Sequence, residues 1–253
     1  MSDKTNRTRS RWIVFAVALP MIIVFGLLVW QTRQDDGRIS GYWPSCKNNL
    51  KYIAIALHQY HEDHGRFPPP YFTDKDGTPM HSWRVILLPA LDESQLYEQY
   101  DFSEPWNGPN NSKLADQMPE VFGCPEQKVT EGRRYTTSTT DYMALVGPNA
   151  AFKPGTSRRL ADFTDGTDHT INVVEVVGST VNWMEPRDLR ITNGHFPING
   201  SPHTIDTGIW SQSVGFYALN VDGSLRFLPA NTDPDTLKAL TTIDGNEPIP
   251  EGF

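Results

Sequence analysis

The chain has 253 residues, of which 38% are hydrophobic and 21% are charged, and this balance suits a folded domain and excludes disorder throughout. Its 20 prolines and 19 glycines predict many turns and long surface connections. The net charge is -8 although the first eleven residues carry +3, so about -11 falls on the remainder. Phosphate binding needs clusters of Lys and Arg, and none follows residue 11, so nucleic acid is excluded as a partner.

An uncharged apolar run extends from Trp12 to Trp30 and reads WIVFAVALPMIIVFGLLVW. A helix of this length covers roughly 28 Å, close to the ~30 Å hydrocarbon core of a bilayer. Tryptophans at both ends suit the two membrane interfaces, and acidic residues follow the run. The positive-inside rule therefore predicts a cytoplasmic basic tail at 1–11, a transmembrane helix at 12–30 and export of the rest to the periplasm or the exterior.

A cleaved signal peptide is the alternative reading of the apolar run. It would have a shorter apolar core followed by a small-x-small cleavage site, and Gln31-Thr32-Arg33 does not provide one. We therefore expect a retained single-pass anchor, a polar linker at 31–42 and one exported domain at 43–253.

The first elements expected in that domain are helices. Leu50, Ile53, Ala54 and Leu57 recur at helical spacing and predict one long helix over Cys46–His64, which Gly65 ends. Shorter helices are expected at Trp83–Leu91 and Ser94–Tyr100.

Strands are expected from residue 120 onward. The runs rich in Val, Ile and Tyr predict strands at Val121–Gly123, Asp141–Val146, Thr170–Val177, Phe216–Val221 and Ser224–Leu228. The last two flank Asp222-Gly223, a strong hairpin signal. Residues 187–213 read as a long surface loop, 232–240 as a closing helix and the tail 248–253 as frayed. The expected fold class is α+β.

Two cysteines, Cys46 and Cys124, stand at the start of the long helix and after the first expected strand. An even number of cysteines in an exported chain favours a disulfide between them. Two buried unpaired thiols remain the alternative, because sequence spacing does not show whether the sulfur atoms are within reach.

Several segments together resemble a known bacterial family. They read CKNNLKYIAIALHQYHEDHGRFPP at 46–69, HSWRVILLPALDESQLYEQYDFSEPWNGPNN at 81–111, FGCPE at 122–126, YMALVGPNAAF at 142–152, LADFTDGTDHTINVVEV at 160–176, WMEPRDL at 183–189 and DGSLRFL at 222–228. They resemble domain of unknown function 1559, whose members look like type IV pilins and type II secretion pseudopilins. The resemblance implies a pilin-like fold, in which a long helix packs on a small antiparallel sheet, and export to the cell envelope. It implies no known reaction.

The chain departs from that family in two places. Typical members carry a Gly-Phe-Thr-Leu-x-Glu prepilin signal before the apolar helix, and its Glu pairs neighbouring subunits in a filament; residues 9–19 here read RSRWIVFAVAL, with neither the Gly nor the Glu. Members also often carry a His ten residues before the Asp-Gly turn, where this chain has Gln212. We therefore expect an uncleaved, laterally mobile protein that contacts an envelope partner through its acidic face and the loop 187–213.

Two groups of residues suggest metal ligands. Asp162, Asp165 and Asp168 place three carboxylates in one short turn, which suits calcium, although Asp-Gly is also the chemistry of a plain turn. His58, His61 and His64 lie three residues apart on the long helix, whereas helical zinc ligands usually stand four apart, so a metal is not expected there.

The acidic residues Glu175, Glu185 and Asp188 raise the question of catalysis. Glu175 and Glu185 could form the acid/base pair of a hydrolase, but such residues more often accept hydrogen bonds or pair with an arginine such as Arg187. Asp222 is expected to shape its turn. Nucleotide-binding fingerprints and serine-hydrolase or zinc-protease motifs are missing from the sequence.

The tryptophans offer one further reading. Trp83, Trp106, Trp183 and Trp210 could line a carbohydrate or peptide groove, or could pack in the core. The sequence therefore favours a non-enzymatic, pilin-like envelope protein without a resident cofactor that acts by structural or protein-protein contacts. A ligand-binding module is the alternative, and a hydrolase is a distant third.

Overall fold

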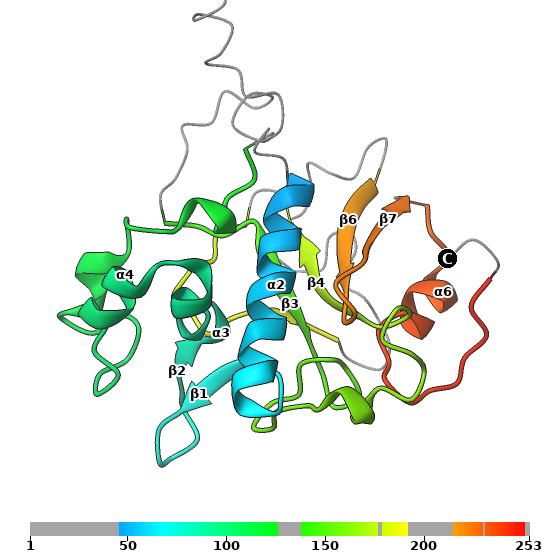
Figure 1. Ribbon diagram of the computed structural model, residues 1–253, viewed down its shortest axis with the longest axis horizontal. Helices are drawn as coiled ribbons and strands as arrows, with labels where there is room; N and C mark the ends of the chain where they lie inside the picture. The colour runs from blue at the N-terminus through cyan, green and yellow to red at the C-terminus, as the bar shows by residue number, and fades with distance from the viewer. Residues whose placement is uncertain (1–45, 126–137, 177–178, 192–214, 230, 251–253) are drawn as a thin grey trace, which may run out of the picture. The chain divides into compact units, whose positions relative to one another are not determined.

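Helix α2 (Cys46–His64) is the first element in the computed structural model, which describes residues 46–125, 138–176, 179–191, 215–229 and 231–250 (Figure 1). Among these residues, no helix is both long enough and apolar enough to cross a membrane. The expected basic tail, transmembrane helix and linker at 1–42 lie outside the described part of the chain. Residues Pro44–Phe253 form a compact unit.

Helix α2 confirms the expected helix and its end. Leu50, Ile53 and Leu57 on its apolar face are at most 1% exposed, and each such burial contributes roughly 2 kcal/mol. At the end of the helix Gly65 adopts a φ of 70°, in the left-handed region, and its N–H donates to the carbonyl of His61 at 2.8 Å. This is the glycine stop that the sequence predicts.

A five-stranded sheet lies behind α2 in the order β5-β3-β4-β6-β7. Its strands are β3 (Tyr142–Val146), β4 (Ile171–Glu175), β5 (Leu189–Arg190), β6 (Gly215–Asn220) and β7 (Leu225–Pro229). Neighbours pair antiparallel except β5, which runs parallel to β3. The fold is therefore α+β with a small, mainly antiparallel sheet, as expected.

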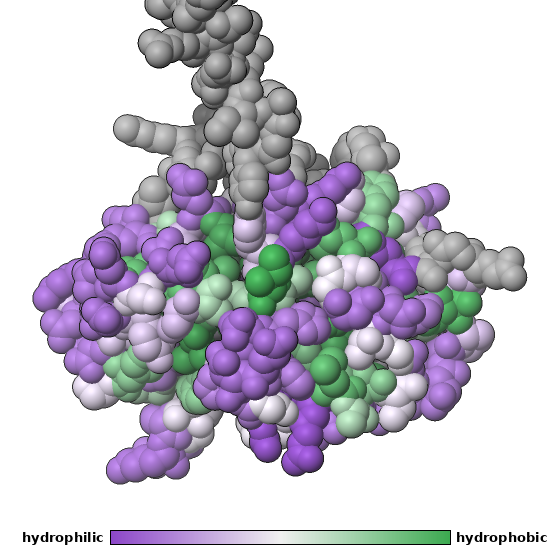
Figure 2. All heavy atoms as spheres, in the orientation of Figure 1, coloured by the Kyte–Doolittle hydropathy of each residue, from purple (hydrophilic) through white to green (hydrophobic). Residues whose placement is uncertain are grey.

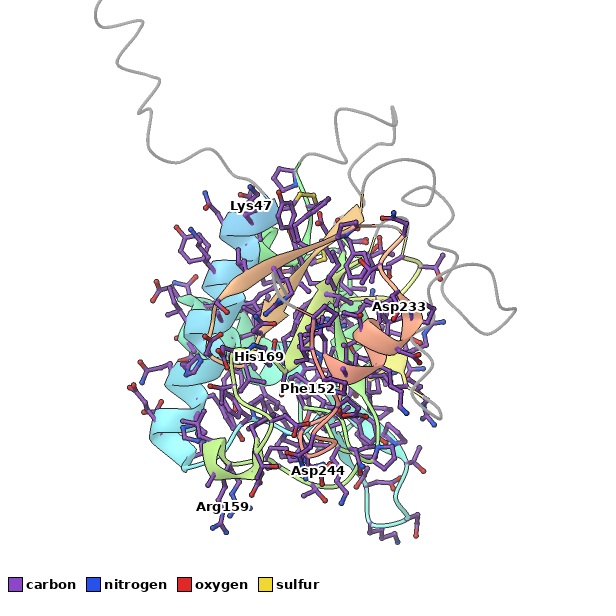
Figure 3. The ribbon with its side chains drawn as sticks, turned by 90° about the vertical axis from the view of Figure 1, so that its right-hand side faces the viewer. Lys47, Phe152, Arg159, His169, Asp233 and Asp244 are labelled. Atoms are coloured by element: carbon purple, nitrogen blue, oxygen red, sulfur yellow. A yellow bond between two sulfur atoms is a disulfide. The ribbon has the colours of Figure 1, made fainter. Side chains whose placement is uncertain are left out.

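Both faces of the sheet are covered, as the side view in Figure 3 shows with α2 on one side and α6 (Pro234–Ala239) on the other. Along β3, Tyr142 and Ala144 belong to the cluster that includes the α2 residues, whereas Met143 and Leu145 belong to the cluster with α6. Alternate residues of a strand face opposite sides, and both sides are covered here, so all five residues of β3 are buried. Covering on both faces explains why this strand reads as a continuous apolar run.

The β6–β7 hairpin confirms the Asp-Gly turn. Gly223 has a φ of 90°, and the Oδ1 of Asp222 accepts hydrogen bonds from the N–H and hydroxyl of Ser224 at 2.8 and 2.6 Å. Asp222 therefore shapes the turn, as the sequence indicated.

The other described elements are short. A two-stranded sheet of β1 (Tyr71–Thr73) and β2 (Pro79–Ser82) lies beside the lower half of α2 in Figure 1, with α3 (Trp83–Ile86) and α4 (Ser94–Gln99) on the same side. Four 3-10 helices complete the set, at Leu88–Leu91, Asn111–Leu114, Glu120–Phe122 and Leu160–Asp162.

Four expectations are corrected. Val121–Gly123 is wrong as a strand, because Glu120–Phe122 forms a 3-10 turn that inserts the fully buried Phe122 into the core. The β1–β2 hairpin was not expected. The loop 187–213 is wrong at its start, because Leu189–Arg190 pairs with β3; residues 192–213 lie outside the described residues. The tail is not frayed as far as Pro250, since Ile249 packs against the cluster containing α6.

Candidate functional site

A disulfide joins Cys46 to Cys124, with 4.9 Å between their Cα atoms, and confirms the expected pairing. Figure 3 shows it at the end of α2 that carries Lys47. Side chains brace both cysteines: the hydroxyl of Tyr142 donates to the carbonyl of Cys46 at 3.2 Å, and Asp141 accepts from the N–H of Cys124 at 2.7 Å. The first turn of α2 is therefore tied to the segment that enters the sheet.

Glu175 lies at this disulfide. Its side chain is 4% exposed, and one carboxylate oxygen lies within 4.8 Å of the sulfur atoms of Cys46 and Cys124. The residue also pairs with Tyr142 across β3 and β4. Among the described residues these three form the one group with metal-ligand spacing, but both sulfur atoms are in the disulfide, so the geometry is that of a structural corner.

A buried ion pair links two segments that are distant in sequence. The Nη2 of Arg84, on α3, lies 2.5 Å from the Oδ1 of Asp188, just before β5, and their side chains are 0% and 2% exposed. Arg84 also donates to the carbonyl of Tyr142 at 3.0 and 3.2 Å and to the hydroxyl of Ser82 at 2.9 Å. The guanidinium thus joins α3, β3 and the segment entering β5.

Asp188 accepts from two further donors. The indole N–H of Trp83 lies 3.2 Å from each carboxylate oxygen, and the N–H of Ala144 lies 2.8 Å from Oδ1. Burial raises the pKa of Asp188 and lowers the pKa of Arg84, and in both cases their mutual attraction opposes the shift. Buried charges need such complete hydrogen bonding, so this network is a structural lock.

The sequence indicates only part of this buried network. The sequence marks Asp188 as a candidate structural acid and offers Arg187 as a partner for the neighbouring glutamates, but it does not indicate Arg84 as the partner of Asp188. A signal existed, because Arg84 is the one charge within the apolar run WRVILLPAL and therefore needs a buried partner. Sequence could not say which of many acids supplies it.

An open hollow of about 730 Å³ lies between the second half of α2, β1, β2 and α4. Tyr60, Phe72, Tyr97 and Phe102 line it with rings, and Asp63 lies at the same wall as Tyr60. In Figure 2 this part of the surface, between α2 and α4, carries pale and green spheres among purple ones. A smaller hollow of about 270 Å³ lies beside Asp188.

The two glutamates of the hydrolase hypothesis have different surroundings. Glu175 is at the disulfide, whereas Glu185 forms a two-point ion pair with Arg187 at 2.7 and 3.1 Å. Neither lines either hollow. Glu185 therefore has the arginine partner that the sequence favoured, whereas Glu175 lies near the disulfide.

The three aspartates of the expected calcium site accept from different partners. Asp162 accepts from the N–H of Arg159 at 2.8 Å, and Asp168 lies 2.9 Å from the Nδ1 of His169, which is labelled in Figure 3. Asp165 accepts from the backbone N–H groups of residues 245 and 246 at 2.7 and 3.0 Å. Within the described residues the three do not form a ligand group, and calcium binding stays a prediction.

The helix histidines also have separate partners. The Nε2 of His58 lies 2.9 Å from the carbonyl of Val221, the ring of His61 packs 4.8 Å from that of Phe67, and His64 stacks on Tyr60 at 4.0 Å. They therefore contact three different neighbours.

The tryptophans that the structure describes serve the core. Trp83 and Trp183 are 0% exposed, and Trp106 is partly buried against the same cluster, while Trp210 lies outside the described residues. A tryptophan-lined groove is therefore wrong for Trp83 and Trp183. The Tyr and Phe rings line the larger hollow instead, and their position depends on how β1 and α4 pack beside α2.

Fold and site together define a small α+β domain with one disulfide, a long first helix on a mainly antiparallel sheet, and a buried Arg-Asp lock. No curated protein and no solved structure matches the chain. The family described as Protein of unknown function (DUF1559) matches residues 44–195, more than half of the chain, and the chain belongs to that family. The match includes both partners of the disulfide and both partners of the lock.

Proposed function

We propose that the chain is an exported, membrane-anchored envelope protein whose pilin-like domain acts by contacts with other proteins. Residues 12–30 hold it in the membrane, residues 1–11 lie in the cytoplasm, and the domain lies in the periplasm or outside the cell. The role is structural or secretion-associated.

The Cys46–Cys124 disulfide is the observation that carries this proposal. Disulfides persist in oxidising compartments and are rare in the cytosol. The apolar run that precedes the domain supplies the route to such a compartment. Helix α2 on the sheet is the arrangement that a pilin-like domain requires.

A non-catalytic role is supported by the surroundings of the acids. Glu175 lies near the disulfide, Glu185 pairs with Arg187, and Asp188 pairs with Arg84. A general acid and base must face one substrate, and this arrangement does not favour that. The acidic charge of the exported part supports a protein partner over nucleic acid or nucleotide.

The proposed partner contact is narrowed to residues 192–213. The sequence suggested 187–213, but Asp188 and Leu189 are buried, so deleting them removes the lock and part of β5. The variant that tests partner capture is therefore a deletion of residues 192–213, which keeps Asp188 and β5 in the chain.

The test uses cells that produce the full-length chain with a C-terminal epitope. We expect the protein to stay in the membrane pellet after carbonate extraction, and the epitope to be digested when protease is added to spheroplasts. Its cysteines should resist alkylation until they are reduced. A soluble protein with two free thiols and a protected epitope would contradict export.

Partner contact is tested by photo-crosslinking from positions within 192–213 in the same cells. We expect a discrete crosslinked product that disappears in the deletion variant, while the thermal stability of the domain stays nearly unchanged. Long filaments of the native protein, or unfolding of the deletion variant, would contradict the proposed mode of action.

A further inference from the structure

Two exposed aromatic side chains line the larger hollow, which lies beside α2. Among the described residues, the large hydrophobic side chains that remain exposed are Ile55, Phe72, Phe102, Leu160 and Phe227. Phe72 and Phe102, each 38% exposed, both line the hollow although they are 30 positions apart in sequence. Exposed apolar surface that converges on a concave site marks a binding surface more often than scattered single residues do.

Other aromatic side chains pack against Phe102 and fix its position in the wall of the hollow. Phe102 packs 5.3 Å from Tyr97, 4.9 Å from Tyr100 and 5.2 Å from His81, measured between ring centroids. Beneath them the Nδ1 of His81 lies 3.0 Å from the hydroxyl of Tyr100, and both side chains are buried. The aromatic wall is therefore positioned before any ligand arrives, which lowers the entropic cost of binding.

The α2 wall adds polar groups to the rings and carries no Lys or Arg. Gln59 and Asp63, four residues apart on α2, present an amide and a carboxylate, and the amide nitrogen of Gln59 lies 3.2 Å from the Oδ1 of Asp63. Thr73, on β1, adds a hydroxyl, and neither Lys nor Arg lines the hollow. Its two histidines already have partners: the Nδ1 of His64 lies 2.9 Å from the carbonyl oxygen of Tyr60, and the Nδ1 of His81 lies 3.0 Å from the hydroxyl of Tyr100. Phosphate, sulfate and carboxylate groups would lack the Lys or Arg counter-charge that strong, bidentate recognition uses.

We propose that this hollow binds a neutral oligosaccharide. A sugar ring presents apolar C–H faces and a rim of hydroxyl groups, which match the rings and the amide, carboxylate and hydroxyl groups that line the hollow. The volume, about 730 Å³, falls within the range of small-ligand sites, about 300–1,000 Å³, and the open mouth admits part of a longer chain. This goes beyond the proposed protein contact at residues 192–213 and does not depend on it.

The test measures binding to the full-length chain in a detergent without a sugar headgroup, because a maltoside would compete. The probes are maltotetraose, cellotetraose and N-acetylchitotetraose, measured by calorimetry and by saturation-transfer NMR. We expect at least one to bind with its ring protons saturated. Failure of all three at concentrations where a Kd of about 1 mM would be seen overturns the proposal.

Two ring variants locate the site. Phe72→Ala and Phe102→Ala should each weaken binding about tenfold, as expected for the loss of an aromatic anchor. Phe227→Ala is the matched control, because Phe227 is also 38% exposed but lies on β7, outside the hollow. If the control weakens binding as much as the ring variants do, the hollow is not the site.

Asp63→Asn decides between a neutral and a cationic ligand. The amide still hydrogen-bonds a hydroxyl, so sugar binding should change less than about threefold. Aromatic rings beside a carboxylate also attract cations. Binding of a lysine-rich peptide in preference to the sugars, with loss of about tenfold or more on Asp63→Asn, would overturn the neutral-sugar assignment. Because Asp63 is exposed, this variant does not threaten the fold.

Discussion

Removing either partner of the Arg84–Asp188 lock should destabilise the domain, and the two losses should differ. Arg84→Met keeps an unbranched side chain but removes the guanidinium, so the Asp188 carboxylate stays buried with only Trp83 and Ala144 donating to it. Breaking a buried pair in this way costs about 3–5 kcal/mol. Asp188→Leu instead leaves a buried guanidinium and also deprives the indole and backbone donors of their acceptor, each at about 1–3 kcal/mol. We therefore expect about 5 kcal/mol or more for Asp188→Leu.

The double variant Arg84→Met/Asp188→Leu removes both charges, so it should cost at least about 1 kcal/mol less than the sum of the single variants. Urea unfolding, followed by tryptophan fluorescence, measures this because Trp83 and Trp183 are 0% exposed when folded. Asp188→Asn is the milder variant if Asp188→Leu exceeds the total stability, which is about 5–15 kcal/mol for most domains.

Single-variant costs below about 1 kcal/mol, or strictly additive costs, would refute a coupled buried network. Arg187→Met is the control, because Arg187 is exposed and its pair with Glu185 is partly solvated. Such a pair contributes at most about 1 kcal/mol.

Three further predictions concern other contacts. Replacing Cys46 and Cys124 by Ser should lower the unfolding free energy by about 4 kcal/mol in the chain-entropy model, measured against the oxidised protein; an unchanged urea midpoint would contradict it. Burial lowers the pKa of His81 below its ordinary 6.5, so on acidification the unfolded chain takes up a proton at this residue before the folded chain does. The unfolding free energy should therefore fall as the pH drops below 6.5, and it should fall less steeply in a His81→Gln variant. Equal slopes of unfolding free energy against pH in the two proteins would contradict this reasoning. Asp165→Ala should speed amide hydrogen exchange at residues 244–250, because Asp165 accepts hydrogen bonds from the backbone N–H groups of residues 245 and 246. Calcium should raise the melting temperature of the native protein only if Asp162, Asp165 and Asp168 rearrange to share one ion, so a large calcium-dependent rise would support the calcium site.

Local patterns predicted the elements that depend on local physics. The helix over Cys46–His64 follows from the spacing of its apolar residues, and its end follows from Gly65. Both signals are local, because they depend only on residues a few positions away in the sequence. The Asp222-Gly223 turn follows from glycine's tolerance of positive φ. Cysteine count and the apolar run favoured the disulfide, but only packing shows that the two sulfur atoms meet.

Long-range packing decided the rest. Val121–Gly123 has the composition of a strand, yet Phe122 is needed in the core and the segment turns as a 3-10 helix to place it there. Leu189–Arg190 is too short to be recognised alone and becomes a strand because Asp188 is held beside β3. Which acid meets Arg84, and which rings share the hollow beside α2, depend on segments far apart in the chain. The long helix, the hairpin turn and the family can be read from local residue patterns, whereas the Arg84–Asp188 pair and the hollow arise from contacts between distant segments, which no local pattern encodes.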